Sequence, residues 1–506
     1  MSESLFAVVR AEVARDPSRV FIERPDGSSI RYADLLVLTG RFAGTLADLG
    51  VRPGDRVAVQ VDKSAEALVL YLATLRAGAV FLPLNPAYTA AEVRFFLGDA
   101  EPALFVCRPE LHSAMAALAK AVGVPRVESL GASGNGTLMQ RLRADGEFDD
   151  ADRAAGDLAA ILYTSGTTGR SKGAMLTHRN LASNARALAD TWRFTADDRL
   201  LHALPIFHTH GLFVATNVTL VTGAAMLLLP RFDLDEIIHL LPKATSMMGV
   251  PTFYTRLLGR PDFDRDLVRH IRLFVSGSAP LSAETHREFF ERTGHSILER
   301  YGMTETGMNT SNPYDGERVP GSVGLPLPGV EIRIAEPKTG RPLPQGEIGV
   351  IEIRGPNVFQ GYWRMPEKTA EDFRPDGFFI SGDLGFIDPR GYVHIVGRDK
   401  DLIISGGFNV YPKEVEAAIQ ALPGVADAAV IGVPHPDFGE GVLAVVVPRP
   451  GDALDEAAMR AELSTQLAGY KLPRRIVFAD ALPLNAMGKV QKTELRQQHK
   501  AMFAGG

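Results

Sequence analysis

Apolar and polar positions in the first half of the chain alternate between two periods. Short β-branched runs predict strands, separated by longer runs of helical period. The predicted strands cover 56–61, 79–84, 103–107, 158–162, 200–204, 224–229 and 273–276. Thr89 and Glu92 have the spacing of a capping box, which starts a helix that extends to about Leu97. This alternation predicts a mostly parallel sheet with helices on both faces, where ligands bind beyond the carboxyl ends of the strands.

The second half of the chain changes character twice. After about residue 325, alternating runs over 330–334 and 349–354 indicate half-buried antiparallel strands of a small β subdomain. Beyond Arg398 to Asp401, helices over 413–422 and 456–467 and strands over 428–433 and 442–447 predict a compact α+β unit. We therefore expect an α/β protein with a large N-terminal domain, 1–398, and a small C-terminal domain, 399–506. The glycine-rich stretch 126–156 is interpreted as a surface excursion.

Composition excludes several classes of protein. The 506 residues carry a net charge of −6 and no basic cluster with interleaved aromatics, which argues against nucleic-acid binding. A single cysteine, Cys107, excludes an internal disulfide framework. No apolar run reaches the roughly 18 residues of a membrane span, and the N-terminal residues lack the features of a signal peptide. We expect a cytoplasmic protein without a membrane span.

The segment 163–173 gathers hydroxyls, glycines and one lysine directly after a predicted buried strand. Such a loop suits a polyphosphate, because glycines bring backbone N–H groups close to phosphate oxygens and the lysine adds a point charge. Lys172 follows Gly169 by three residues and precedes Gly173, so the Walker A spacing is not met. The candidate phosphate-binding residues are Thr164, Ser165, Gly166, Thr167, Thr168, Gly169 and Lys172.

Four further segments place charged, hydroxyl-bearing or glycine residues in predicted loops or at the ends of predicted elements. They are Arg300-Tyr301-Gly302-Met303-Thr304-Glu305-Thr306, Ser381-Gly382-Asp383, Ile404-Ser405-Gly406-Gly407-Phe408 and Pro483-Leu484-Asn485-Ala486-Met487-Gly488-Lys489. Each alone has an ordinary structural explanation, such as a helix–loop junction, an Asx-turn, a helix start or a solvated lysine. Together with the glycine-rich loop, in this order, the chain resembles the AMP-forming acyl-CoA synthetase superfamily, which includes luciferases and the adenylation domains of peptide synthetases.

The resemblance implies a role for each motif. Tyr301 would stack on adenine, and Thr304 would bond the α-phosphate. Glu305, with Thr168, would hold Mg²⁺. The nucleotide contacts would be completed by Asp383 and Arg398 at the ribose, by Ser278 and Ala279, and by Lys489 at the α-phosphate.

The resemblance also implies that the C-terminal domain moves. Lys400 would be the hinge, and Gly406 and Gly407 would line the path of the coenzyme A arm. The reaction would join an acid to coenzyme A through an acyl-adenylate, with ATP, Mg²⁺ and coenzyme A required. Acylation of Lys489 by a modifying enzyme would remove its charge and switch the reaction off.

Within that superfamily, the segments around His208, Ser276 and Arg300 are similar to those of malonyl-CoA synthetases. Bulky Met303 and His208, the latter also a candidate catalytic residue, would shorten the acid pocket. A dicarboxylate such as malonate or methylmalonate needs a cation for its distal group, and the candidates are Arg231, Arg287 and Arg300. The alternatives are a short- or medium-chain monocarboxylate ligase, a stand-alone adenylation domain that loads a carrier protein, a luciferase-like oxidase and a non-catalytic nucleotide sensor.

Overall fold

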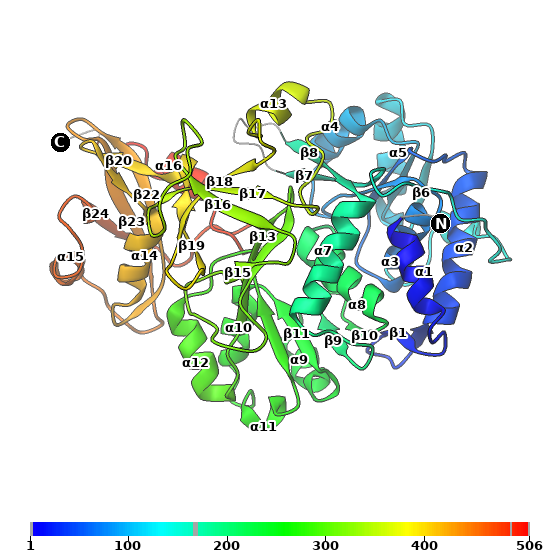
Figure 1. Ribbon diagram of the computed structural model, residues 1–506, viewed down its shortest axis with the longest axis horizontal. Coiled ribbons are helices and arrows are strands. Elements are labelled where there is room, and N and C mark those ends of the chain that lie inside the picture. Colours follow the sequence, from blue (N-terminus) through cyan, green and yellow to red (C-terminus); the bar gives the residue numbers. More distant parts are fainter. Residues whose placement is uncertain (1–3, 165–170, 486–487, 504–506) are drawn as a thin grey trace.

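The computed structural model describes residues 4–164, 171–485 and 488–503. Within these residues the strands form four sheets, of nine, six, five and four strands. The N-terminal elements lie at one end of the molecule and the C-terminal elements, orange to red, at the other (Figure 1). No helix among the described residues has the length and apolar character needed to cross a bilayer.

The six-stranded sheet carries the candidate phosphate loop. Its strand order is β6 (Val127–Ser129), β5 (Leu104–Cys107), β3 (Arg56–Gln60), β4 (Val80–Pro83), β7 (Leu158–Thr164) and β8 (Lys172–Thr177). The first five strands run parallel, and β7 pairs antiparallel with β8. The loop therefore joins two paired strands, with Thr164 opposite Lys172.

The expectation for 126–156 is wrong in part, because this stretch supplies strand β6 and helix α6 (Thr137–Gln140). Its later part is anchored by Asp150, which pairs with Arg10 at 2.5 Å and with buried Arg76 at 2.6 Å. Sequence polarity did not reveal these arginine partners, of which Arg76 is buried.

The nine-stranded sheet forms the centre of the molecule. Its order is β15 (Leu325–Pro326), β14 (Gly307–Ser311), β13 (Leu298–Met303), β12 (Leu273–Ser276), β11 (Ser246–Gly249), β9 (Arg199–His202), β10 (Ala225–Leu228), β1 (Val20–Glu23) and β2 (Ser29–Arg31). The strands from β13 to β1 run parallel. Strands β9, β12 and β13 thus end at one edge, as the alternating pattern predicted.

Helices cover both large sheets. They are α1 (Leu5–Val13), α2 (Tyr32–Asp48), α3 (Ala65–Arg76), α4 (Ala90–Ala100), α5 (His112–Ala121), α7 (His178–Thr191), α8 (Asn217–Thr222), α9 (Leu234–Leu240), α10 (Pro251–Leu258), α11 (Arg265–Val268) and α12 (Ala283–Thr293), with 3₁₀ turns Pro109–Leu111 and Leu241–Lys243. The predicted capping box at α4 is present, because the Thr89 N–H donates to Glu92 Oε2 at 2.7 Å. A π-helix, η2 (His210–Thr216), precedes α8.

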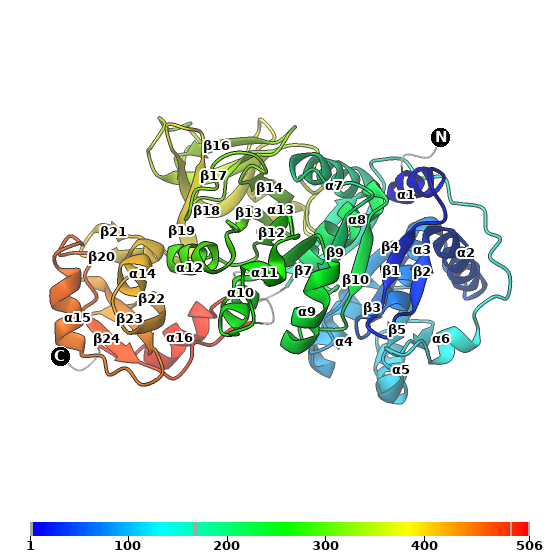
Figure 2. The ribbon, with the colours of Figure 1, turned by 90° about the horizontal axis from the view of Figure 1, so that it is seen from below.

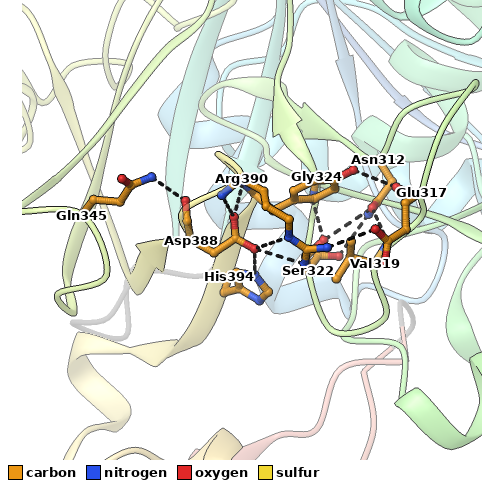
Figure 3. A network of polar contacts seen from close by, with 10 residues as sticks. Asn312, Glu317, Val319, Ser322, Gly324, Gln345, Asp388, Arg390 and His394 are labelled. Atoms are coloured by element: carbon orange, nitrogen blue, oxygen red, sulfur yellow. Dashed lines mark hydrogen bonds and ion pairs between the residues drawn. The ribbon is translucent and has the colours of Figure 1, made fainter.

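The four-stranded antiparallel sheet consists of β16 (Glu331–Ala335), β17 (Gly349–Arg354), β18 (Phe379–Ile387) and β19 (Val393–Arg398), with α13 (Pro366–Glu371) before β18. Polar contacts tie its β18–β19 hairpin to the segment after β14 (Figure 3). Arg390 Nη1 donates to Glu317 Oε2 at 3.0 Å, and the Val319 N–H donates to Asn312 Oδ1 at 3.0 Å. The network holds the hairpin against the central sheet.

The C-terminal sheet follows the 3₁₀ turn Asp399–Asp401. It comprises β21 (Phe408–Val410), β20 (Ile403–Ser405), β23 (Gly439–Pro448), β22 (Val425–His435) and β24 (Arg475–Phe478), with helices α14 (Pro412–Gln420), α15 (Glu456–Leu463) and α16 (Lys492–His499). This unit contacts the rest of the chain through an ion pair between Arg449 and Glu284. A Cβ at Gly488 would lie 3.5 Å from Thr252 Oγ1 of α10, and Figure 2 shows the red segment that leads into α16 beside α10.

Candidate active site

Three residues from neighbouring segments form one polar cluster between the sheets. Tyr301, near the end of β13, donates from its hydroxyl to Asp383 Oδ2 at 2.6 Å. Arg398 Nε lies 3.0 Å from Asp383 Oδ1, because β18 and β19 pair these two residues directly. Asp383 is 4% exposed, so its carboxylate is held by the tyrosine and the arginine rather than by water. The structure thus brings together the three residues expected at the adenosine end of a nucleotide.

A second cluster surrounds Glu305. Its Oε1 lies 3.4 Å from Thr164 Oγ1 and accepts a hydrogen bond from the Tyr362 hydroxyl at 3.2 Å. Burial raises the pKa of the Glu305 carboxyl, although nearby Lys172 opposes the rise. The Lys172 ammonium lies 4.1 Å from the centre of the Tyr362 ring and 3.7 Å from Asp372 Oδ2. The two charged groups predicted for polyphosphate and metal therefore face each other across one aromatic ring.

Ser165, Gly166, Thr167, Thr168 and Gly169 lie outside the described residues. Their flanks, Thr164 and Lys172, are both at the Glu305 cluster. Glu305 is a buried carboxylate among hydroxyl and ammonium groups, and this set of donors fits Mg²⁺ with a phosphate, since Mg²⁺ prefers oxygen ligands. Thr304 and Met303 are half-buried beside it.

Lys489 approaches the site from the C-terminal unit. It remains accessible to solvent, yet desolvation between the two parts of the chain, with the nearby charge of Arg398, lowers the pKa of its ammonium to about 8. The charge of Lys489 helps to lower the pKa of His208, while the charges of Asp383 and Glu305 act to raise the pKa of Lys489 itself. Lys489 therefore lies between the adenosine and phosphate clusters and the segment that follows β9.

The segment after β9 carries two histidines. Burial lowers the pKa of His208 to about 3, and the charges of Lys489 and Arg300 contribute. Burial also lowers the pKa of His210, whose Nδ1 lies 3.2 Å from Ser278 Oγ, so both imidazoles are neutral near pH 7. Ser278 has a φ of 71°, a region that a residue with a side chain adopts at a cost and that is frequent at functional sites. Ala279 follows it, half-buried.

Arg300 is buried and forms no ion pair with an acidic residue in the part of the chain that the structure describes. It is 4% exposed, and neither its Nε nor its Nη2 has a hydrogen-bond acceptor among the described residues. Burial lowers the pKa of its guanidinium to about 9, which still leaves it charged at neutral pH. The guanidinium packs on Gly277, where a Cβ would lie 2.4 Å from Arg300 Cζ.

Two more buried polar atoms on the adjoining segments have no hydrogen-bond partner within residues 4–164, 171–485 and 488–503. They are Oγ of Ser276, at the end of β12 next to β13, and Nε2 of His210. A buried hydrogen-bonding group without a partner costs on the order of 1–3 kcal/mol, so a concentration of them points to a ligand. Arg231 and Arg287, the other candidate cations, are exposed.

The predicted coenzyme A residues lie apart from these clusters. Gly406 and Gly407 form the turn between β20 and β21 with φ of 59° and 82°, and both are exposed. Lys400 lies in the 3₁₀ turn between the four-stranded sheet and the C-terminal sheet. The hinge and the path for the coenzyme A arm stay predictions.

Comparison with known proteins shows the family to which this chain belongs. Residues 9–363 match the family described as AMP-binding enzyme, and residues 414–489 match the AMP-binding enzyme C-terminal domain. The chain belongs to the AMP-binding enzyme family.

Relatives of this AMP-binding enzyme include acid–CoA ligases. A feruloyl-CoA synthase from Amycolatopsis is 39% identical over 94% of this chain and 95% of its own. A mitochondrial malonate–CoA ligase from Mus musculus is 36% identical over 89% of this chain and 83% of its own. The crystal structure of ATP-bound MatB from Rhodopseudomonas palustris is 59% identical, with a TM-score of 0.97 over 99% of this chain and 100% of that one.

Sequence reasoning missed several residues of the AMP-binding enzyme's site. Tyr362 contacts both Lys172 and Glu305, but it lies 57 positions from the latter and no motif marks it. His210 was visible only as part of the segment around His208. The signal for Arg300 was present, but burial alone separates it from Arg231 and Arg287.

Proposed function

We propose that this protein joins malonate, or the related methylmalonate, to coenzyme A through a malonyl-adenylate, with release of pyrophosphate and AMP. The observation that carries the malonate assignment is the buried Arg300 guanidinium without a carboxylate partner. The family membership supports the adenylate chemistry, and the Mus musculus malonate–CoA ligase supports the acid.

The distal carboxylate of malonate supplies what the buried polar groups lack. It would accept from Arg300 Nε and Nη2, and from Ser276 Oγ or His210 Nε2. Arginine is suited to this role because its planar guanidinium binds a carboxylate through two hydrogen bonds. The same groups would reject a monocarboxylate, since an uncharged chain would leave the guanidinium buried and unpaired.

The adenosine and phosphate clusters would hold ATP. Asp383 would accept from the ribose hydroxyls, and Tyr301, now bonded to Asp383, would lie against adenine. Mg²⁺ bound at Glu305 would neutralise part of the phosphate charge. Lys172 and Lys489 would supply positive charge as the proximal carboxylate oxygen attacks the α-phosphorus and the bond to the β-phosphate oxygen breaks. The coenzyme A sulfur, after loss of its proton, would then attack the acyl carbon and AMP would leave.

The relatives also suggest an aromatic acid such as ferulate as the substrate. The feruloyl-CoA synthase from Amycolatopsis is the more similar in sequence, at 39% against 36% for the mouse malonate–CoA ligase. A bulky aromatic acid has no distal carboxylate, so it would not satisfy Arg300. The geometry therefore favours malonate over ferulate and over butyrate.

The test is a pyrophosphate-release screen of the full-length protein with C2 to C8 mono- and dicarboxylic acids and ferulate, with and without coenzyme A. We expect malonate or methylmalonate to give the highest kcat/KM and a coenzyme A-dependent thioester. Highest activity with a monocarboxylate or ferulate would refute the acid assignment, and transfer only to a carrier protein would refute the acceptor. A cytoplasmic location and acylation of Lys489 remain predictions of ours.

A further inference from the structure

Lys63 is a buried lysine that the reaction described above does not use. It follows β3 directly before Ser64, the N-cap of α3, and is 8% exposed. Its ammonium lies 2.9 Å from His202 Nδ1 and donates to the His202 carbonyl oxygen at 2.8 Å. No carboxylate forms an ion pair with Lys63 in the described part of the chain. Burial lowers the pKa of the Lys63 amine, so its contribution rests on its hydrogen bonds to His202 rather than on an ion pair.

The imidazole of His202 connects Lys63 to Gly211, the residue next to His210. His202 ends β9, and its Nε2 lies 2.9 Å from the carbonyl oxygen of Gly211. A carbonyl can only accept, so Nε2 carries the proton and Nδ1 is the acceptor for the Lys63 ammonium. The Gly211 carbonyl and Lys63 together fix the tautomer and the plane of the His202 ring.

Gly211 lies at a tightly packed position of the backbone. It belongs to π-helix η2, an irregular element that is frequent at functional sites. A Cβ at Gly211 would lie 2.1 Å from the Pro205 carbonyl oxygen, and the Thr216 hydroxyl donates to the same Gly211 carbonyl at 2.9 Å. The residue directly before Gly211 is His210, whose imidazole contacts Ser278.

We propose that Lys63 and His202 are positioning residues for the acid subsite: the hydrogen bonds from Lys63 through His202 to Gly211 hold the His210 imidazole beside Ser278 and Arg300. This inference rests on the proposed function, because it assumes that His210 and Arg300 face the acid. It predicts that Lys63 affects recognition of the acid more than that of ATP, although it touches neither.

The experiment compares Lys63→Met, His202→Phe, the double variant and Tyr71→Phe in the full-length protein. Tyr71→Phe is the matched control, since the buried Tyr71 hydroxyl donates to Asn217 Oδ1 at 3.2 Å just beyond η2 without joining the Lys63 chain. KM for malonate, KM for ATP, kcat and melting temperature are measured for each.

We expect Lys63→Met to raise KM for malonate about tenfold, the effect of one lost buried hydrogen bond, with KM for ATP unchanged. The double variant should resemble His202→Phe, because two residues of one chain are not additive. If Lys63→Met does not fold, His202→Phe must still raise KM for malonate selectively.

Three results would overturn the inference. They are equal changes in KM for both substrates, a loss of melting temperature alone as in the Tyr71 control, and additive effects in the double variant. Failure of the parent protein to use malonate would instead refute the proposed function, and this inference with it. A parent that uses malonate beside an unaffected Lys63→Met variant refutes the inference alone.

Discussion

Replacing Arg300 by methionine tests the acid subsite with a variant that fills the same space without charge. If Arg300 pairs with the distal carboxylate of malonate, removing it leaves that carboxylate desolvated and unpaired, at a cost of about 2–5 kcal/mol. Each 1.4 kcal/mol is a factor of ten, so kcat/KM for malonate should fall roughly thirty- to several-thousand-fold. Butyrate, which has no distal charge, should be used as well as by the parent or better.

The same substitution should affect stability in the opposite direction. Arg300 Nε and Nη2 lack acceptors, so methionine removes an uncompensated buried charge from the free protein. Exchanging buried ionic groups for apolar side chains of similar size is often neutral or stabilising, by about 1–4 kcal/mol. We therefore expect the melting temperature of Arg300→Met to match or exceed that of the parent.

The assay is kcat/KM for malonate, methylmalonate and butyrate by pyrophosphate release, with thermal melting in parallel. Arg231→Met and Arg287→Met are matched controls, because both arginines are exposed. Their malonate-to-butyrate ratios should stay within about threefold of the parent. The reasoning fails if Arg300→Met leaves that ratio unchanged, or if it lowers all three activities together with the melting temperature.

Four further predictions concern ATP, Mg²⁺ and coenzyme A. Lys489→Ala should nearly abolish adenylate formation yet convert supplied acyl-AMP and coenzyme A to thioester, and equal loss in both assays would contradict this. Because the pKa of Lys489 is lowered to about 8, its ammonium becomes neutral as the pH rises through 8, so kcat/KM for adenylation should fall there; Lys489→Arg should shift that fall to higher pH. Gly407→Leu should still exchange pyrophosphate but make little thioester, at some cost in stability because its φ is 82°; normal thioester output would remove Gly407 from the path. Tyr362→Phe, which loses the hydroxyl bonded to Glu305 but keeps the ring beside Lys172, should raise the Mg²⁺ concentration needed for ATP binding measured by calorimetry, and an unchanged requirement would separate Tyr362 from the metal site.

The structure brings together the residues that the sequence assigned to the nucleotide, and the sequence could name them because they lie in short, contiguous motifs. Tyr301 and Glu305 share one motif, and Asp383 follows a glycine at a recognisable turn. The acid side depends on burial, which a single sequence does not reveal. From the sequence alone, Arg231 and Arg300 are equally plausible partners for a carboxylate. Only the structure shows that Arg231 is exposed and Arg300 is buried.

Contacts between residues far apart in the chain could not be predicted either, because they depend on how the strands are arranged in space. Lys63 and His202 are 139 positions apart, and their contact follows from how β3 and β9 end in two different sheets. The positions of the strands and helices were predicted better, because the hydrophobic pattern that indicates them lies within each short segment. The prediction for 126–156 was wrong in part because strand β6 has three residues and helix α6 has four, which is too short for hydrophobic periodicity to reveal.

The most direct test of the account is a competition between acids in one reaction. The full-length protein receives ATP, Mg²⁺, limiting coenzyme A and equimolar malonate, butyrate and ferulate, and the thioesters are quantified by mass spectrometry. Because the product ratio equals the ratio of kcat/KM values, the unpaired Arg300 predicts malonyl-CoA in large excess over both other thioesters. Butyryl-CoA or feruloyl-CoA as the main product would contradict the assignment of this site to a dicarboxylate.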